Sequence, residues 1–261
     1  MTKTTTLAAL LAAGASLAAC GGSGDAGPPP PPPPQPQTFS YAPPPLGTSD
    51  TWTRTLTDSV GTSVLLQLRQ RVTQANADGS EAWTYDDPTA VDEIHDGVTF
   101  RTTPQVDDIA ANGNTVDYTN THVDGTQVTC TYGQPTTGTA IANAGRVTAL
   151  AARRGESFSI GQSWTNSYSI SCAGQATVNY QAVVDVPGYE TVTVPAGTFQ
   201  AVKETVHLTW VDNGVAGTSD TTLWRDPAHW MFPVKSDQAI ARSGATTAYI
   251  TRDQRELASR Q

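Results

Sequence analysis

Apolar and polar residues alternate along much of the second half of the chain. The clearest run covers residues 176–184, where every second position is apolar: Ala176, Val178, Tyr180, Ala182 and Val184. The polar residues Thr177, Asn179 and Gln181 stand between them. A period of two is typical of a β-strand that buries one face.

Short turn signals separate these alternating runs. They are Asp78-Gly79, Asp96-Gly97, Asn112-Gly113, Asp124-Gly125 and Asn213-Gly214. Such pairs adopt the positive φ angles that tight hairpins require. We therefore expect one hairpin across Asp124-Gly125, joining residues 116–118 to 128–132. We expect a second across Asn213-Gly214, joining 202–210 to the strand that contains Thr221 and Leu223.

Helix signals are few. Residues 140–154 are rich in alanine, end in Arg153 and Arg154, and precede Gly155, which favours one helix. Asp87-Pro88 and Thr103-Pro104 resemble the starts of single-turn or two-turn helices. The sequence thus predicts a mainly β protein: a single curved antiparallel sheet or half-barrel with one or a few short helices.

Charge and composition narrow the function. The 261 residues include 24 acidic and 15 basic side chains, a net charge of −9. An acidic chain of this kind does not fit a basic nucleic-acid binder. Beyond the N-terminus no apolar run reaches the length of a membrane-spanning helix.

The N-terminus reads as an export signal. Lys3 precedes an apolar stretch, Leu7 to Leu17, and small residues follow. The sequence Leu17-Ala18-Ala19-Cys20 resembles the lipobox of bacterial lipoproteins. The resemblance implies that residues 1–19 are removed as a signal peptide and that the Cys20 thiol carries a diacylglycerol, so that the membrane is a partner. Gly21 in place of aspartate implies the outer membrane. A soluble export signal with a chance cysteine is the alternative.

Residues 20–47 form the lipidated cysteine and a disordered, proline-rich stalk. Pro28 to Pro34 is uninterrupted, and Pro36 and Pro43 to Pro45 follow. Consecutive prolines favour an extended polyproline II conformation. The folded antiparallel β domain is expected to cover residues 48–261.

Cys130 and Cys172 are expected to form a disulfide. An exported protein folds in an oxidising compartment, and each cysteine shares its parity with apolar neighbours in an alternating run. A redox or metal site is the alternative, but the chain lacks Cys-x-x-Cys and both cysteines lack a neighbouring histidine. We expect no metal and no cofactor.

Three segments resemble a family of bacterial envelope proteins of unknown function. They are Gly161-Gln162-Ser163-Trp164, the turn Val194-Pro195-Ala196-Gly197-Thr198-Phe199, and residues 224–227 leading to Pro233-Val234-Lys235. The resemblance implies a curved sheet similar to the half-barrel of lipoprotein carriers, whose concave face accepts acyl chains. Residues 47–53 echo 161–165, which suggests a two-fold repeat of the sheet.

Catalytic motifs are absent from the sequence. It has no Gly-x-Ser-x-Gly elbow, no His-Glu-x-x-His and no phosphate-binding loop. His207 is expected to be an exposed strand residue. A carboxylate-dependent hydrolase would need two of Asp86, Asp87, Asp92 and Glu93 to converge in one cleft.

Aromatic residues gather in the second half. The set Trp164, Tyr168, Tyr180, Trp210 and Trp224 is explained either as core or as an apolar ligand face.

We interpret the protein as a non-enzymatic outer-membrane lipoprotein facing the periplasm or the cell surface, with an apolar small molecule or an envelope protein as partner. The alternatives are a carrier or sensor that holds a lipid or other apolar ligand, and the hydrolase.

Overall fold

Strands make up the regular structure of the part of the chain that can be described. The computed structural model describes residues 38–40, 43–86, 93–95, 98–100, 104–110, 115–121, 125–137, 157–229 and 232–261. The signal peptide, Cys20, most of the stalk and the helix expected at 140–154 lie outside these residues. The turns Asp96-Gly97 and Asn112-Gly113 do as well.

The strands fall into one large sheet and two short pairs. The short pairs are β1 (Thr38–Ser40) with β10 (Ser157–Ser159), and β5 (Glu93–His95) with β6 (Val98–Phe100). The strands of the large sheet are β2 (Ser49–Asp58), β3 (Ser63–Ala75), β4 (Glu81–Asp86), β7 (Gln105–Ile109), β8 (Thr115–Thr121), β9 (Gln127–Thr137), β11 (Ser163–Cys172), β12 (Val178–Val194), β13 (Gly197–Asp212), β14 (Val215–Asp226), β15 (Phe232–Ser243) and β16 (Ile250–Arg260).

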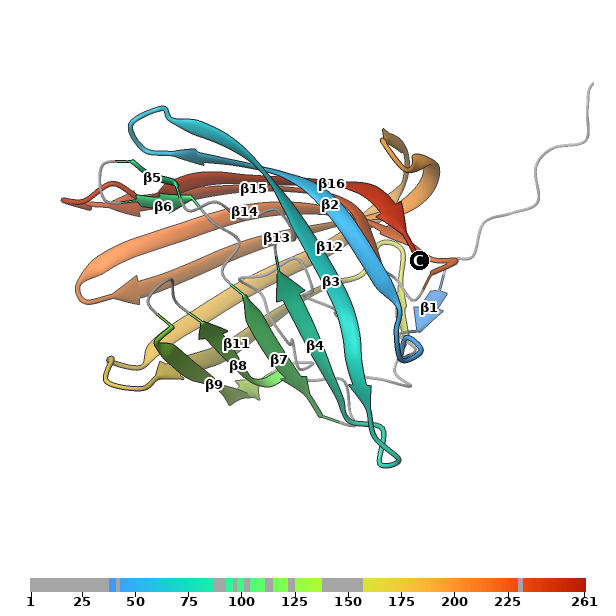
Figure 1. The fold of residues 1–261 in the computed structure, drawn as a ribbon, viewed down its shortest axis with the longest axis horizontal. Helices are drawn as coiled ribbons and strands as arrows, with labels where there is room; N and C mark the ends of the chain where they lie inside the picture. Colours follow the sequence, from blue (N-terminus) through green and yellow to red (C-terminus); the bar gives the residue numbers. More distant parts are fainter. Residues whose placement is uncertain are drawn as a thin grey trace, which may run out of the picture. The chain divides into compact units, whose positions relative to one another are not determined.

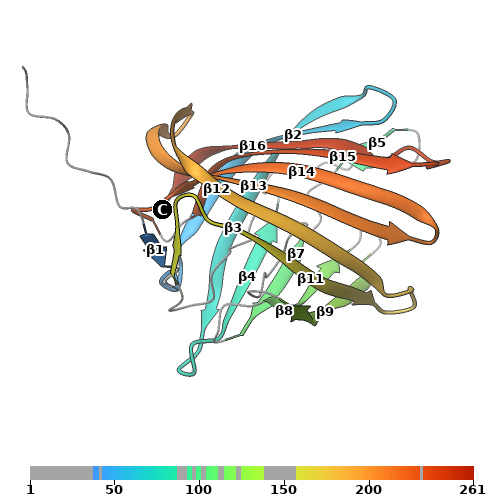
Figure 2. The ribbon, with the colours of Figure 1, turned by 180° about the vertical axis from the view of Figure 1, so that it is seen from behind.

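The large sheet closes into a barrel. Its order among the described residues is β11-β12-β13-β14-β15-β16-β2-β3-β4-β7-β8-β9, with every neighbouring pair antiparallel. Figures 1 and 2 show β2, in blue, beside β16, in red, so the first and last strands of the barrel are neighbours. The pairing of β9 with β11 closes the circle. The expected half-barrel is therefore wrong, because both edges that it would leave open are hydrogen-bonded.

The expected short helices are not found among the described residues. The prediction of a helix after Thr103-Pro104 is wrong, because Gln105 to Ile109 forms β7, which pairs with β4 on one side and β8 on the other. In β7 the buried residues alternate with exposed Val106 and Asp108, so sheet pairing overrides the capping signal. The helix expected at Asp87-Pro88 lies outside the described residues. No described helix is long and apolar enough to span a membrane.

Alternation along the strands gives the barrel an inner and an outer face. In β12, Ala182, Val184 and Val186 are fully buried, whereas Gln181 and Val183 on the opposite face are exposed. This confirms the period-two prediction from Val178 onward, whereas Ala176 and Thr177 precede β12 and are exposed. Both expected hairpins are confirmed, as β8 pairs with β9 and β13 pairs with β14. In the second hairpin Asn213 and Gly214 have φ angles of 48° and 81°.

The Val194–Phe199 motif forms the turn of the β12–β13 hairpin, as expected. Val194 pairs with Gly197, and Phe199 packs against an apolar cluster. The Ala196 N–H donates a 3.0 Å hydrogen bond to the carbonyl of Leu257 in β16. The hairpin end thus lies against the strand that ends the chain.

The suggested two-fold repeat is visible in the backbone. The Gly47 N–H donates to the carbonyl of Val72, and the Val72 N–H donates back to the carbonyl of Thr48. The second half of the barrel starts with the same pair of bonds. There the Gly161 N–H donates to the carbonyl of Val186, and the Val186 N–H donates back to the carbonyl of Gln162. The strands that follow, β2 and β11, each contain 10 residues. Position 52 in the first half thus corresponds to position 166 in the second.

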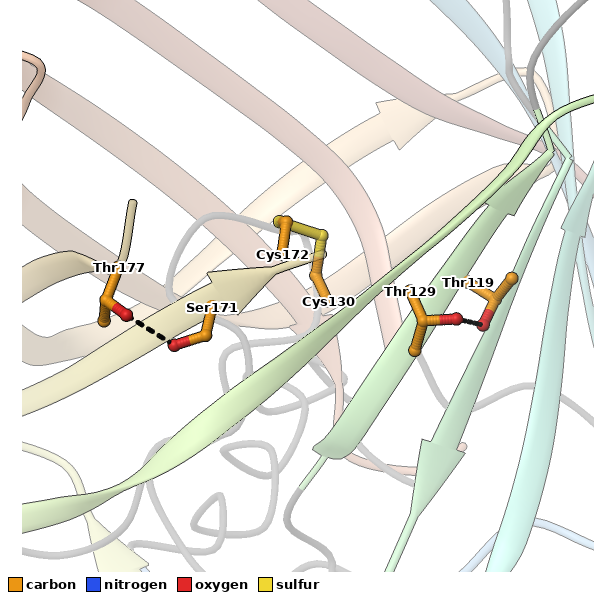
Figure 3. The surroundings of a disulfide bond; sticks show 6 residues. All are labelled: Thr119, Thr129, Cys130, Ser171, Cys172 and Thr177. Carbon is orange, nitrogen blue, oxygen red and sulfur yellow. Dashed lines mark hydrogen bonds between the residues drawn. A yellow bond between two sulfur atoms is a disulfide. The ribbon is translucent and has the colours of Figure 1, made fainter. Parts of the chain in front are cut away.

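The disulfide between Cys130 and Cys172 is confirmed. The two residues stand directly opposite each other in the β9–β11 pair, which is one of the contacts that close the barrel. Figure 3 shows the bond together with two hydroxyl pairs, Thr119–Thr129 and Ser171–Thr177. Each pair includes the residue next to a cysteine and therefore belongs to the opposite face of its strand.

Removal of the disulfide should weaken the closed barrel. In the chain-entropy picture, a cross-link over 42 residues contributes about 4 kcal/mol. We expect the double variant Cys130→Ser/Cys172→Ser to lose about this much free energy of unfolding in urea titrations. A reducing agent should lower the stability of the native protein and leave the double variant unchanged. Equal stability of the oxidised protein and the double variant would contradict this role.

Candidate functional site

A row of aromatic side chains crosses five neighbouring strands on the inner face. Tyr168, Tyr180 and Trp210 lie directly opposite one another on β11, β12 and β13. The Tyr168 and Tyr180 rings are stacked, with centroids 5.0 Å apart and planes 8° apart. Tyr132 on β9 and Tyr118 on β8 continue the row, with successive centroids 6.1 and 5.7 Å apart. We call these five residues the aromatic row.

A glycine ends the aromatic row. The Trp210 ring lies 5.9 Å from that of Tyr180, and Gly217 on β14 stands opposite Trp210. A Cβ atom at position 217 would overlap the Trp210 indole. The missing side chain therefore gives the indole the space to lie flat along the wall.

Apolar residues surround the aromatic row. Val184, Val206, Leu208 and Leu223 are at most 2% exposed, whereas Tyr180 and Trp210 are only half-buried. A cavity of about 700 Å³ borders β11 to β14, and Tyr168, Tyr180 and Trp210 are part of its lining. Burial raises the pKa of Tyr180 to about 12, an effect to which the nearby Tyr118 and Asp212 add and which Arg242 opposes. The Tyr180 hydroxyl therefore stays protonated and able to donate a hydrogen bond.

The adjoining wall is polar. Ser219, Thr221 and Ser236 on β14 and β15 are buried, and the Gln238 side-chain amide donates to the Ser219 hydroxyl at 2.9 Å. The barrel interior beside the aromatic row therefore gains buried hydroxyl groups on β14 and β15, where they stand among apolar residues such as Leu223 and Val234. A ligand that touched both walls would need an apolar part and a hydrogen-bonding part.

Buried ion pairs fix this polar wall. The Arg225 guanidinium donates to Glu204 at 2.7 Å, and both side chains are 1% exposed. Burial raises the pKa of Glu204, and the charge and hydrogen bond of Arg225 oppose that rise. Arg54 and Arg255, paired across β2 and β16, each donate two hydrogen bonds to the Asp253 carboxylate.

Four of the five residues predicted to form a possible ligand face lie on the same side of the sheet. Trp164, Tyr168, Tyr180 and Trp210 share the inner face, but Trp224 does not. Trp224 alternates with the buried Leu223 and Arg225, so its indole lies on the other side of β14. There the ammonium groups of Lys203 and Lys235 stand 5.8 and 5.7 Å from the ring centroid. The expectation that Trp224 belongs to the face is therefore wrong.

The predicted set also omitted two members of the aromatic row, Tyr118 and Tyr132. The alternation of residues in the sequence did indicate them, because both tyrosines lie on the same side of the sheet as Cys130, which is buried. The buried polar residues of β14 and β15 gave no comparable signal. Serine and threonine at alternate positions resemble an exposed face until closure of the barrel is known.

The remaining sequence predictions concern His207, the acidic residues of the hydrolase hypothesis and a metal site. His207 is exposed, as expected, and its Nδ1 lies 2.7 Å from a carboxylate oxygen of Asp220. Asp86 forms ion pairs with Arg69 and Arg71. Asp87 and Asp92 lie outside the described residues, as does the side chain of Glu93. Within the described ranges no three acidic, histidine or cysteine side chains are grouped as a metal site would require.

The Asp253 ion pairs predict acid sensitivity. Burial alone would raise the pKa of Asp253, but Arg255 and Arg54 outweigh burial and lower it. A lowered folded-state pKa contributes stability above pH about 4, and this contribution is lost as the pH falls. Asp253→Asn should cost about 3–5 kcal/mol at pH 7, because two largely buried arginines lose the carboxylate that they share. Urea titrations at pH 7 and pH 3 should show a smaller acid-induced loss in the variant. An equal loss would contradict the assignment.

Comparisons with known proteins add a likeness of fold. No family model matches the chain, and no curated protein matches it. A protein described as exported, with a YmcC-like fold, from Bacteroides fragilis is 14% identical, with a TM-score of 0.46 over 85% of this chain and 99% of that one. A protein described as a lipoprotein, from Parabacteroides distasonis, is 13% identical, with a TM-score of 0.42 over 85% of this chain and 99% of that one. A protein described as the lipoprotein YmcC, from Escherichia coli, is 13% identical, with a TM-score of 0.36 over 80% of this chain and 83% of that one. The resemblance to an envelope family therefore stays a prediction.

Proposed function

We propose that this protein is a non-enzymatic, lipid-anchored binding protein of the bacterial envelope whose barrel holds an amphipathic small molecule against the aromatic row. The observation that carries this proposal is the row itself. It joins five neighbouring strands in one band of rings, from Tyr118 to Trp210. Such rings present large apolar area with few rotatable bonds, which suits contact with an apolar chain or ring.

Incomplete burial favours a binding role over a purely structural core. Val184 and Val206, on the same inner face, are at most 2% exposed, yet Tyr180 and Trp210 keep part of their surface accessible. Their accessible parts meet the cavity of about 700 Å³. That volume falls within the roughly 300–1,000 Å³ typical of small-molecule sites. The half-exposed end of the row is thus the part available to a ligand.

The polar wall favours an amphipathic ligand over a purely apolar one. The Ser219 and Thr221 hydroxyls lie on β14, directly beside the strand that carries Trp210. The ionised groups nearby are already neutralised, since Glu204 is paired with Arg225. Hydroxyls and amides rather than charges would therefore meet the ligand's polar part.

Ion pairing also supports a role outside catalysis. Asp50 is fully buried and is bonded to Arg260 in β16. Asp253 is held by two arginines in the same way. A general acid or base must exchange protons with a substrate, and a carboxylate fixed by arginines is poorly suited to that task. Asp86, the candidate hydrolase carboxylate whose side chain is described, is likewise paired with Arg69 and Arg71, and we therefore favour binding over the carboxylate-dependent hydrolase.

Anchoring is proposed from the N-terminal sequence. The resemblance of Leu17-Ala18-Ala19-Cys20 to a lipobox supports a lipid on Cys20, and Gly21 favours the outer membrane. The disulfide between Cys130 and Cys172 supports an oxidising compartment. The proline-rich stalk would hold the barrel away from the bilayer surface, in the periplasm or at the cell surface.

Binding can be tested with N-phenyl-1-naphthylamine, an apolar probe whose fluorescence rises in apolar surroundings. We expect saturable binding to the native barrel and about tenfold weaker binding to Trp210→Leu, because a stacked aromatic contact is lost. Trp224→Leu is the matched control, since this indole lies on the other side of β14, and it should bind like the native protein. No saturable binding, or equal weakening by both variants, would contradict the proposed function.

Anchoring can be tested by mass spectrometry of the protein extracted from membranes of the producing cells. We expect a mature chain that begins at Cys20 and carries the mass of the attached acyl groups. Cys20→Ser should abolish the added mass and release the protein from the membrane fraction, because lipid chains supply the hold on the bilayer. A native protein that kept Met1 and carried no lipid would refute the anchor.

A further inference from the structure

Asn166 is a buried polar residue whose side chain has no hydrogen-bond partner in the part of the chain that the structure describes. It lies on the inner face of β11, between Trp164 and Tyr168 on that face, and stands opposite Ala182 of β12. Asn166 is 0% exposed, and among the described residues neither its Nδ2 nor its Oδ1 atom has a hydrogen-bond partner. Within the same residues, the indole Nε1 of Trp164 is also buried without a partner.

Such a residue is costly to the fold. Each buried donor or acceptor left unsatisfied destabilises a protein, and buried polar groups in native proteins are nearly always paired. The fold does not require a polar residue at this position. The corresponding residue in the first half of the barrel is Trp52, which packs among apolar residues such as Leu68 and Leu257. The amide at position 166 therefore calls for an explanation other than packing.

The unpaired donors and acceptor define the kind of ligand group that could form hydrogen bonds with them. The Asn166 side chain offers two N–H donors and one carbonyl acceptor, and the Trp164 indole adds one donor. The apolar residues close to them, Ala182, Val184 and Tyr168, belong to the same cluster. A charged ligand group would be poorly solvated there. The fitting group is uncharged and carries both a carbonyl and an N–H, which describes an amide.

We propose that Asn166 and the Trp164 indole bind the amide group of an N-acyl or N-alkyl amide amphiphile. The ligand carbonyl accepts from the asparagine or indole N–H, and the ligand N–H donates to Oδ1 of Asn166. Tyr168 is the next inner-face residue of β11 and belongs to the aromatic row, so the ligand's apolar chain continues along that row. This inference rests on the proposed function and specifies the class of its ligand.

Two matched compounds test the proposal by displacement of N-phenyl-1-naphthylamine. N-Octylacetamide and octyl acetate have the same chain and carbonyl, but only the amide has an N–H. We expect the native protein to prefer the amide about tenfold, because the ester leaves Oδ1 of Asn166 unpaired. In Asn166→Leu the two compounds should bind equally. Thr165→Val changes the neighbouring outer-face residue and should keep the preference.

The outcomes separate the inference from the proposed function. Equal binding of amide and ester to the native protein would overturn the inference while leaving an apolar site in place. A preference that persists in Asn166→Leu would overturn it too, since another group would then select the amide. If the naphthylamine itself fails to bind, the proposed function falls. Circular dichroism melting curves establish that each variant is folded.

Discussion

Closure of the sheet is the constraint on which the rest of this structure depends. Two strand pairs complete the circle: β16 with β2, and β9 with β11. Once both are formed, every strand residue points either into the barrel or away from it. Closure therefore turns a simple alternation of residues into a lined interior. The Cys130–Cys172 bond stabilises one of these two contacts covalently.

The interior that results is divided along its circumference. Strands β8 to β13 contribute the aromatic row and aliphatic side chains, whereas β14 and β15 add buried hydroxyls to the apolar Leu223 and Val234. Neutralised ion pairs such as Glu204–Arg225 lie at the boundary. The division explains why a ligand with both apolar and uncharged polar parts fits better than a hydrocarbon or a salt.

Local features could be predicted from the sequence because their causes are local. The Asn213-Gly214 hairpin and the inward parity of Cys130 depend only on neighbouring residues. Closure of the barrel could not be predicted, because the backbone hydrogen bonds between its first strand, β2, and its last strand, β16, leave no side-chain pattern in the sequence. The sequence analysis assigned Trp224 to the wrong side of its strand, because it grouped the aromatic residues by their number in the second half of the chain. Alternation with the buried Leu223 would have placed Trp224 on the opposite side. Asn166 was missed because a polar residue in a strand usually marks an outer face.

The repeated start at Gly47 and Gly161 gives the barrel two halves of six strands each, β2 to β9 and β11 to β16 with the short β5–β6 pair set aside. Neither half can close by itself, since each would present two bare edges. Each edge of one half finds its complement only on the other, at the pairs formed by β9 with β11 and β16 with β2. Separation of the two halves would leave those edges open, and unpaired strand edges are the places where sheets of different molecules join and aggregate.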